Sequence, residues 1–270
     1  MNSIGKNYFD IGYMDTLAEG ESSLHRLDPR AKLITTAAFI IAVISFDKYT
    51  LSGLTPFFIY PAVLIAVSGL PAGYILKKVL LVSPFAVVVG IFNPLMDRSV
   101  LLHIGSLDIS GGWISFFSIL GRFVLTVTAA LILIALTGFN AVCRALTKLG
   151  IPKPFVVQLL FFYRYIFVLS DEAERMVRAR SLRAFQSSGM RFPLFISFVG
   201  QLLLRTLDRA QRIYLAMCCR GFDGQIRMIK SMSIRHRDIV FVSVWLAIFV
   251  FLRYVNVPLY LGGLLMGVGQ

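Results

Sequence analysis

Two arginines flanked by small residues are the side chains in this sequence best suited to bind another protein. They lie in the stretch 171–221, within the triplets Ala179-Arg180-Ser181 and Cys219-Arg220-Gly221. A small neighbour lets the backbone of a partner come close, while the planar guanidinium group pairs with a carboxylate. We therefore predict that Arg180 and Arg220 contact a partner protein. We also expect Arg220 in the last turn of a helix, directly before Gly221 at the C′ position.

Three carboxylates in the same stretch could instead carry out acid–base chemistry. Asp171, Glu172 and Glu174 follow one another closely. We favour a structural role, in which they occupy the first turn of a helix, where the helix dipole favours negative charge, or pair with Arg175 and Arg178 at helical spacing.

Other arginines have simpler roles, with one exception. We expect a solvated or headgroup-facing surface for most of a set that comprises Arg175, Arg178, Arg183, Arg205, Arg209, Arg212 and Arg227. The exception is Arg122, which lies inside an apolar segment and is therefore a candidate functional residue. Snorkelling to the outer headgroups, or contact with Asp97 or Asp108, explains it equally well.

Cysteines and histidines give no sign of a metal or cofactor site. The three histidines are scattered without ligand spacing: His25, His103 and His236. We place all three cysteines, Cys143, Cys218 and Cys219, in a reducing cytoplasmic region, where the adjacent pair serves as small packing residues. We therefore predict no catalytic residue, no metal ligand and no bound cofactor.

The composition is typical of a polytopic membrane protein. Of 270 residues, 57% are hydrophobic and only 15% are charged, and the mean hydropathy is +0.77. The net charge of +13 raises the alternative of nucleic acid binding. No basic surface interleaved with aromatic residues occurs, so we exclude nucleic acid and assign the excess charge to cytoplasmic loops and anionic lipid headgroups of the bilayer.

The pattern predicts an all-α polytopic membrane protein with about five transmembrane helices and a cytoplasmic coupling domain of arginine-rich helices. Asp28 is expected to cap the first span, with Pro29 in its first turn and Arg26, Arg30 and Lys32 at the headgroups. The predicted spans are 33–46 (extended to 31–49), 51–70, 79–96, 113–137 and 239–252. Residues 97–112 are expected to form an external loop, and 257–268 an apolar tail.

Charge sets the orientation. Positive residues gather at 26–32, at 77–78 and throughout 144–237, so these segments are assigned to the cytoplasm and the N-terminus with them. The resulting domains are a cytoplasmic segment 1–32, transmembrane helices 33–138, coupling helices 139–237, and a final span with its tail at 238–270. Segment 155–170 is apolar enough to span, but we place it at or just under the membrane because it contains Arg164.

An apolar stripe in the coupling helices is expected to pack against neighbouring helices: Ile196, Val199, Leu203 and Leu207.

Four features together resemble the transmembrane T component of energy-coupling factor (ECF) transporters, in the cobalt-type CbiQ branch. They are LHRLDPRAKL before the first span, FFYRYIFVLSDEAERMVRARS, the block AMCCRGF and the late terminal span. Arg180 and Arg220 match the arginines of the two small-Arg-small motifs of this family. Ser181 stands where glycine is also common, and Cys219 where alanine is usual.

The resemblance implies a scaffold in the plasma (inner) membrane and not an enzyme. In that family the T component joins a pair of ABC-type ATPase subunits to a substrate-binding membrane S component, here CbiM-like. The coupling residues would be Ala179, Arg180, Ser181, Cys219, Arg220 and Gly221. The cargo implied is cobalt, as used in cobalamin biosynthesis, with nickel or a vitamin as the alternative. No GxxxxGKS/T nucleotide motif occurs, as expected of a scaffold.

Two other functions fit the sequence less well. An integral membrane enzyme acting on lipids or isoprenoids needs clustered Asp or His at a membrane face, and the predicted spans lack such acids. A self-contained permease needs polar residues along a path, and the spans offer almost none. The transporter scaffold is the function that the sequence favours.

Overall fold

The structure, a computed structural model, describes residues 12–47, 50, 52–96, 100–104, 107–183, 192–224 and 234–255. The chain divides into two compact units. We call residues 14–142 with 232–270 the bundle. The second unit comprises residues 1–13 and 143–231 and contains α7 (Lys153–Arg183) and α8 (Phe192–Cys219), so we call it the α7–α8 unit.

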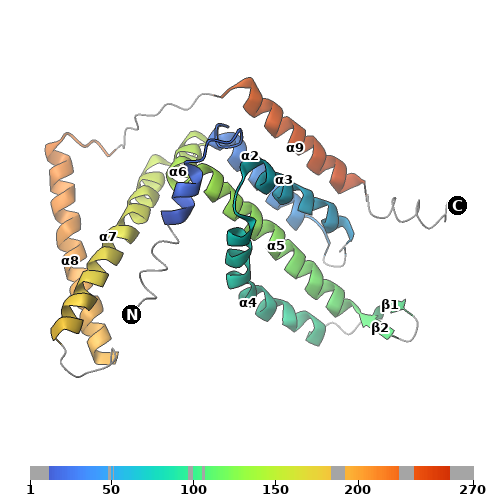
Figure 1. The fold of residues 1–270 in the computed structure, drawn as a ribbon, viewed down its shortest axis with the longest axis horizontal. Coiled ribbons are helices and arrows are strands. Elements are labelled where there is room, and N and C mark those ends of the chain that lie inside the picture. The colour runs from blue at the N-terminus through green and yellow to red at the C-terminus, as the bar shows by residue number, and fades with distance from the viewer. Residues whose placement is uncertain are drawn as a thin grey trace. The chain divides into compact units, whose positions relative to one another are not determined.

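Most described residues of the bundle are helical (Figure 1). Its elements are α2 (Pro29–Ile44), the 3-10 helix η1 (Ser52–Phe58), α3 (Ile59–Ser68), α4 (Ala72–Met96), the strands β1 (Val100–Ile104) and β2 (Leu107–Ser110), α5 (Gly111–Thr137) and α9 (His236–Tyr254). A short helix, α6 (Phe139–Lys148), crosses the border between the units. The predicted all-α membrane protein is confirmed.

Three helices of the described chain are long and apolar enough to cross a membrane: Ala72–Pro94, Gly111–Thr137 and Lys153–Arg183. Two of them correspond to predicted spans. The helix α4 begins at Ala72, so Lys77 and Lys78 lie inside it and not before it as predicted. The third includes the segment 155–170, so length and composition allow this segment to cross, and its placement under the membrane stays a prediction.

The start of α2 agrees with the sequence. Asp28 is the N-cap, its side chain accepts a hydrogen bond from the Arg30 backbone N–H at 2.9 Å, and Pro29 occupies the first turn. Proline suits this position because its missing N–H would have no partner inside the helix.

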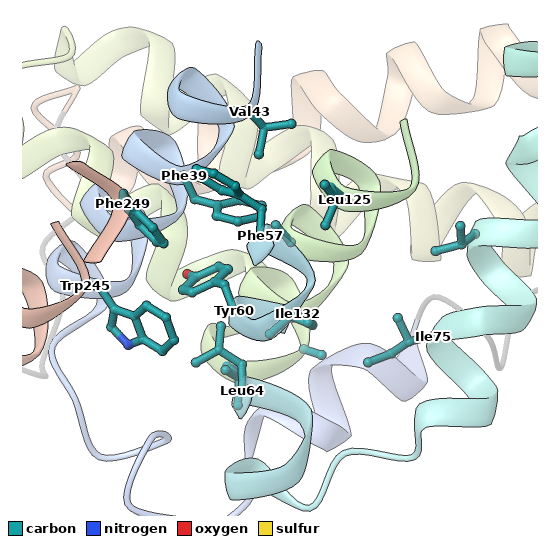
Figure 2. Packing of buried hydrophobic residues seen from close by; sticks show 14 of the residues in the cluster. Phe39, Val43, Phe57, Tyr60, Leu64, Ile75, Leu125, Ile132, Trp245 and Phe249 are labelled. Atoms are coloured by element: carbon teal, nitrogen blue, oxygen red, sulfur yellow. The ribbon is translucent and has the colours of Figure 1, made fainter. Parts of the chain in front are cut away.

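Aromatic rings form the centre of the bundle and connect helices that lie far apart in the sequence (Figure 2). The Phe39 ring stacks on Tyr60 at 4.5 Å between centroids and lies 5.4 Å from Phe249. Tyr60 also meets Trp245 edge to face at 4.8 Å. Since Phe39 comes from α2, Tyr60 from α3 and the other two from α9, these contacts join the start and end of the chain into one core.

The segment 97–112, predicted as a loop, contains a β-hairpin. Strands β1 and β2 pair antiparallel, with His103 opposite Asp108. β1 begins with three consecutive apolar residues after the end of α4. This apolar run is too short to predict a strand from the sequence. The hairpin connects α4 to α5, which pack closely on each other.

The α7–α8 unit contains little buried surface. Helix α7 is continuous over 31 residues, and Val156 is its single buried residue among those described. Helix α8 has no buried residue. No helix begins at Asp171, so the interpretation of the acidic cluster as a first turn is wrong.

Several predicted features fall outside the described residues. They are the apolar tail 257–268, residues 1–11 of the N-terminal segment, residues 184–191 of the arginine-rich stretch, and the side chains of Asp97 and Arg227.

Candidate functional site

The first small-Arg-small triplet lies in the last turn of α7. Arg180 is three residues from the helix end at Arg183 and is half-buried, whereas Ala179 and Ser181 are exposed. The Ser181 hydroxyl donates to the Arg178 carbonyl at 2.8 Å, as short polar side chains often do in helices. The guanidinium charge of Arg180 therefore sits where the helix dipole favours a cation.

The second triplet forms the C-terminal end of α8. The Gly221 N–H donates to the Cys218 carbonyl at 3.0 Å, and the Phe222 N–H to the Met217 carbonyl at 3.1 Å. This pair of hydrogen bonds is the Schellman motif, and Gly221 at its C′ position has φ +75°. A left-handed residue here is easiest for glycine, so the predicted C′ role of Gly221 is confirmed. Arg220 directly precedes it and is exposed.

An ion pair joins the two helices. The Arg205 Nη1 atom of α8 donates to the Glu172 Oε1 atom of α7 at 2.8 Å. The same carboxylate accepts from Arg175 at 2.9 Å, and Glu174 accepts from Arg178 at 3.1 Å. The predicted pairing with Arg175 and Arg178 is therefore confirmed for Glu172 and Glu174.

The two triplets point away from the place where the helices touch. Arg180 lies eight residues beyond Glu172, roughly 12 Å along α7, and Arg220 lies fifteen residues beyond Arg205, roughly 22 Å along α8. Figure 1 shows α7 and α8 crossing, with the end of α7 near the start of α8 and the end of α8 remote from both. The structure thus keeps Arg180 and Arg220 apart, and they cannot bind the same carboxylate.

The apolar stripe of α8 is exposed, which contradicts the prediction that it packs against neighbouring helices of the chain. The exposed fractions run from 44% to 57% for Ile196, Val199, Leu203 and Leu207. At 100° per residue these four side chains occupy one side of the helix. Arg205, Arg209 and Arg212 occupy the opposite side and are also exposed. Helix α8 is therefore amphipathic and has one apolar and one cationic face.

Arg122 lies on α5, and the side chains of its two predicted acidic partners, Asp97 and Asp108, lie outside the described part of the structure. The Arg122 Nη2 atom donates to the backbone carbonyl of Asp47, which lies just beyond α2. The contact ties α5 to the end of α2, so a structural role explains this charge within an apolar helix.

The cysteines differ in accessibility. All three thiols are free. Cys143 is buried, and this burial raises the pKa of its thiol to about 11. Cys218 and Cys219 are exposed, so their predicted role as packing residues is wrong. Among the described residues no three His, Cys, Asp or Glu side chains gather as a metal site would require.

A buried polar cluster at the start of α2 was not predicted. The Asp238 carboxylate of α9 accepts from the Asp28 N–H at 2.8 Å and from the Arg235 N–H at 2.7 Å. Lys32 is only 6% exposed, and its Nζ atom donates to the Leu136 carbonyl at 2.9 Å, at the end of α5. The prediction that Lys32 lies among the headgroups is therefore wrong.

His25 completes this cluster. Its ring lies 2.6 Å from the Ser22 hydroxyl and 3.0 Å from the Leu17 carbonyl, and its own carbonyl accepts from Lys32 at 3.1 Å. Burial lowers the pKa of His25, and the Lys32 charge acts in the same direction. The motif LHRLDPRAKL thus fastens α2 to α5 and α9. The sequence signal that could have predicted this cluster is the position of Lys32 on the buried side of α2.

Comparisons with known proteins agree with these features. A family model described as "Cobalt transport protein" (CbiQ) matches residues 20–232, which is well over half of the chain. The energy-coupling factor transporter transmembrane protein EcfT of Ruminiclostridium cellulolyticum is 29% identical over 228 residues, covering 77% of this chain and 84% of its own.

Two further relatives show the same extent of similarity. EcfT of Clostridium kluyveri is 25% identical over 241 residues, covering 82% of this chain and 88% of its own. The uncharacterized protein MJ1571 of Methanocaldococcus jannaschii is 28% identical over 228 residues, covering 81% of this chain and 77% of its own. The matched region contains the Asp28–Lys32 motif and both arginine triplets, and the chain belongs to the CbiQ family of transporter membrane components.

Proposed function

We propose that this chain is the T component of an ECF-type importer, which transmits the motion of a pair of ABC-type ATPase subunits to a substrate-binding S component of the CbiM-like kind. The observation that carries the proposal is the position of the two triplets. Each places an arginine at the C-terminal end of a helix, and the two helices contact each other between these ends.

The separation of Arg180 from Arg220 fits two docking sites better than one. Each triplet has its own helix end, and each has small neighbours that leave room for a partner's backbone. Two ATPase subunits can then each bind one triplet. The Glu172–Arg205 ion pair connects the helices, so a displacement of one end acts on the other.

Pairing with a carboxylate would make each arginine important once the complex has formed. An arginine that becomes buried against a partner and then loses its carboxylate costs roughly 3–5 kcal/mol. That cost corresponds to a loss of affinity of roughly 100- to 4,000-fold.

The apolar face of α8 is the basis for proposing that this helix contacts the membrane-embedded S component. Ile196, Val199, Leu203 and Leu207 form an exposed stripe that aqueous solvent would not favour. An S component, whose surface lies in the bilayer, supplies apolar side chains to cover it. The arginine face of α8 then turns toward the cytoplasm and the anionic headgroups.

The proposed topology follows from the charge distribution. The N-terminus and residues 139–237 lie in the cytoplasm, about five helices cross the plasma (inner) membrane, and 155–170 lies at or just under it. We propose Co²⁺ as the cargo on the basis of the family description, with selectivity residing in the S component.

Charge reversal at both triplets tests the proposal. The double variant Arg180→Glu, Arg220→Glu should insert into the membrane, lose co-purification with the ATPase subunits in detergent and abolish uptake of radioactive Co²⁺ by cells that contain all components. Radioactive Ni²⁺ measured in parallel tests the cargo, since equal uptake of both ions would contradict cobalt selectivity.

The matched control is the double variant Arg209→Glu, Arg212→Glu. It reverses the same amount of charge on exposed residues of α8 outside the triplets. We expect this control to keep ATPase binding and most of the uptake. Full uptake by the Arg180, Arg220 variant would refute the coupling role of the triplets.

The native cysteines test the topology. A membrane-impermeant maleimide should label Cys218 and Cys219 only after cells are permeabilised, because these exposed thiols lie in the segment assigned to the cytoplasm. The variant Cys218→Ser, Cys219→Ser should lose nearly all labelling, since burial raises the pKa of the remaining Cys143 thiol to about 11 and suppresses its reactive thiolate. Labelling in intact cells would overturn the orientation.

A further inference from the structure

A cavity of about 650 Å³ lies in the bundle between the segment before α2 and the start of α9. Its volume falls in the range of small-molecule sites, roughly 300–1,000 Å³. Neither the coupling role nor any predicted site uses it.

One end of the cavity is cationic. Arg26 contributes from the N-terminal segment, and Arg235 and Arg237 contribute from the start of α9. All three side chains are exposed, and among the described residues none is joined to a carboxylate by an ion pair. The one acid in the lining, Asp238, is occupied by the backbone N–H groups of Asp28 and Arg235. Three arginines against one carboxylate leave this end with a net positive charge, which favours an anion.

Apart from Ser23 and His236, the remainder of the lining is apolar. Val240, Phe241 and Val244 follow Arg237 at positions i+3, i+4 and i+7, so they extend along the same side of α9. Trp245 closes the end, and its ring packs edge to face on Tyr60 (Figure 2). A ligand that fits this cavity has an anionic head and an apolar chain.

We propose that the cavity binds an anionic phospholipid, with its phosphate among Arg26, Arg235 and Arg237 and one acyl chain along Val240 and Val244 toward Trp245. The location suits a lipid, because α2 and α9 both begin at this end and carry apolar residues away from it. Trp245 lies eight residues beyond Arg237, roughly 12 Å along the helix. That distance separates a headgroup from the upper part of its acyl chains in a hydrocarbon core about 30 Å thick.

Trp245 provides a direct readout of acyl-chain contact. The chain has two tryptophans, so the variant Trp113→Phe leaves Trp245 as the only tryptophan, whose emission can be excited selectively. The full chain carrying this variant is reconstituted in phosphatidylcholine vesicles that contain increasing fractions of either dibrominated phosphatidylglycerol or dibrominated phosphatidylcholine. Bromine quenches tryptophan on contact. We expect half-maximal quenching at a several-fold lower fraction of the phosphatidylglycerol.

Two pairs of variants distinguish the contribution of the cationic end from that of the contact with the acyl chain. Arg26→Gln with Arg237→Gln should remove the preference for phosphatidylglycerol, whereas Lys77→Gln with Lys78→Gln, which removes the same charge outside the cavity, should retain it. Val244→Phe should weaken quenching by filling the groove. Val250→Phe, at an exposed position of α9 outside the cavity, should not.

Each opposite result overturns the proposal. Equal quenching by the two brominated lipids, or a preference that survives the arginine double variant, would remove the anionic site. If the Lys77→Gln, Lys78→Gln control also lost the preference for phosphatidylglycerol, that preference would result from general surface charge. Inorganic phosphate at millimolar concentration distinguishes a free anion: the lipid preference should persist, and its complete suppression would make phosphate and not lipid the ligand.

Discussion

The bundle and the α7–α8 unit use similar residues in opposite ways. In the bundle, Phe39 of α2 is fully buried against rings from α3 and α9. In the α7–α8 unit, Leu203 of α8 is 57% exposed, and the contact between the two helices is an ion pair at the surface. Apolar residues at helical spacing therefore stabilise the fold in one unit and form an uncovered face in the other.

This difference separates stability from association. A unit with a buried core is stable through its own contacts, whereas an exposed apolar face gains most when a partner or lipid covers it. We expect substitutions in the bundle to act on folding, and substitutions in the α7–α8 unit to act on assembly.

The largest contrast should come from truncating one apolar side chain in each unit. Phe39→Ala should lower the free energy of unfolding by about 3–5 kcal/mol, because it leaves a cavity among aromatic rings. Leu203→Ala should leave the stability of the isolated chain within about 0.5 kcal/mol and weaken co-purification with the S component. Denaturant unfolding in detergent measures the first effect and affinity purification the second. A large loss of stability in Leu203→Ala would contradict the conclusion that the apolar face of α8 contributes little to folding.

Within the bundle, the buried polar cluster should be the next most sensitive feature. Asp238→Asn removes the charge that accepts from the Asp28 and Arg235 N–H groups, and it leaves Lys32 with less compensation. We expect a decrease of about 1.5–3 kcal/mol in the free energy of unfolding. Asp208→Asn, at an exposed acid of α8, is the matched control and should change it by less than about 0.5 kcal/mol. Equal effects would show that Asp238 adds no more than a surface acid.

The smallest effect should come from the contact between α7 and α8. Glu172 and Arg205 form an exposed pair, which is typically worth about 0.2–1 kcal/mol. A double-mutant cycle with Glu172→Gln and Arg205→Gln should give a coupling energy in this range, and the coupling should fall as salt rises. A coupling energy well above this range would mean that the α7–α8 unit has an internal stability comparable to that of the bundle.

Local signals in the sequence predicted the features that depend on nearby residues. Asp28 and Pro29 predicted the start of α2, because an N-cap and a first-turn proline act within a few positions. Gly221 predicted the end of α8 for the same reason. The acidic residues at 172 and 174 predicted their arginine partners at helical spacing.

Features that depend on distant contacts were predicted less well. Lys32 was placed among headgroups because its sequence neighbours are basic, yet its partners include Leu136, more than a hundred residues away. The stripe that includes Leu203 was expected to pack within the chain, since periodicity identifies a face but not what covers it. The position of Arg220 at a helix end could be predicted from the sequence, whereas that of Arg180 was not, and the partner contacts of both residues stay a prediction.

The continuity of α7 has a mechanical consequence. Its 31 residues extend roughly 46 Å, and between Phe155 and Arg183 the chain contains neither proline nor glycine, the residues at which helices most often kink. A tilt imposed on the arginine-rich half must therefore reappear as a tilt of the apolar half, with little lost to bending. Such a helix acts as a stiff lever, and the direction of its movement depends on where along its length it is held.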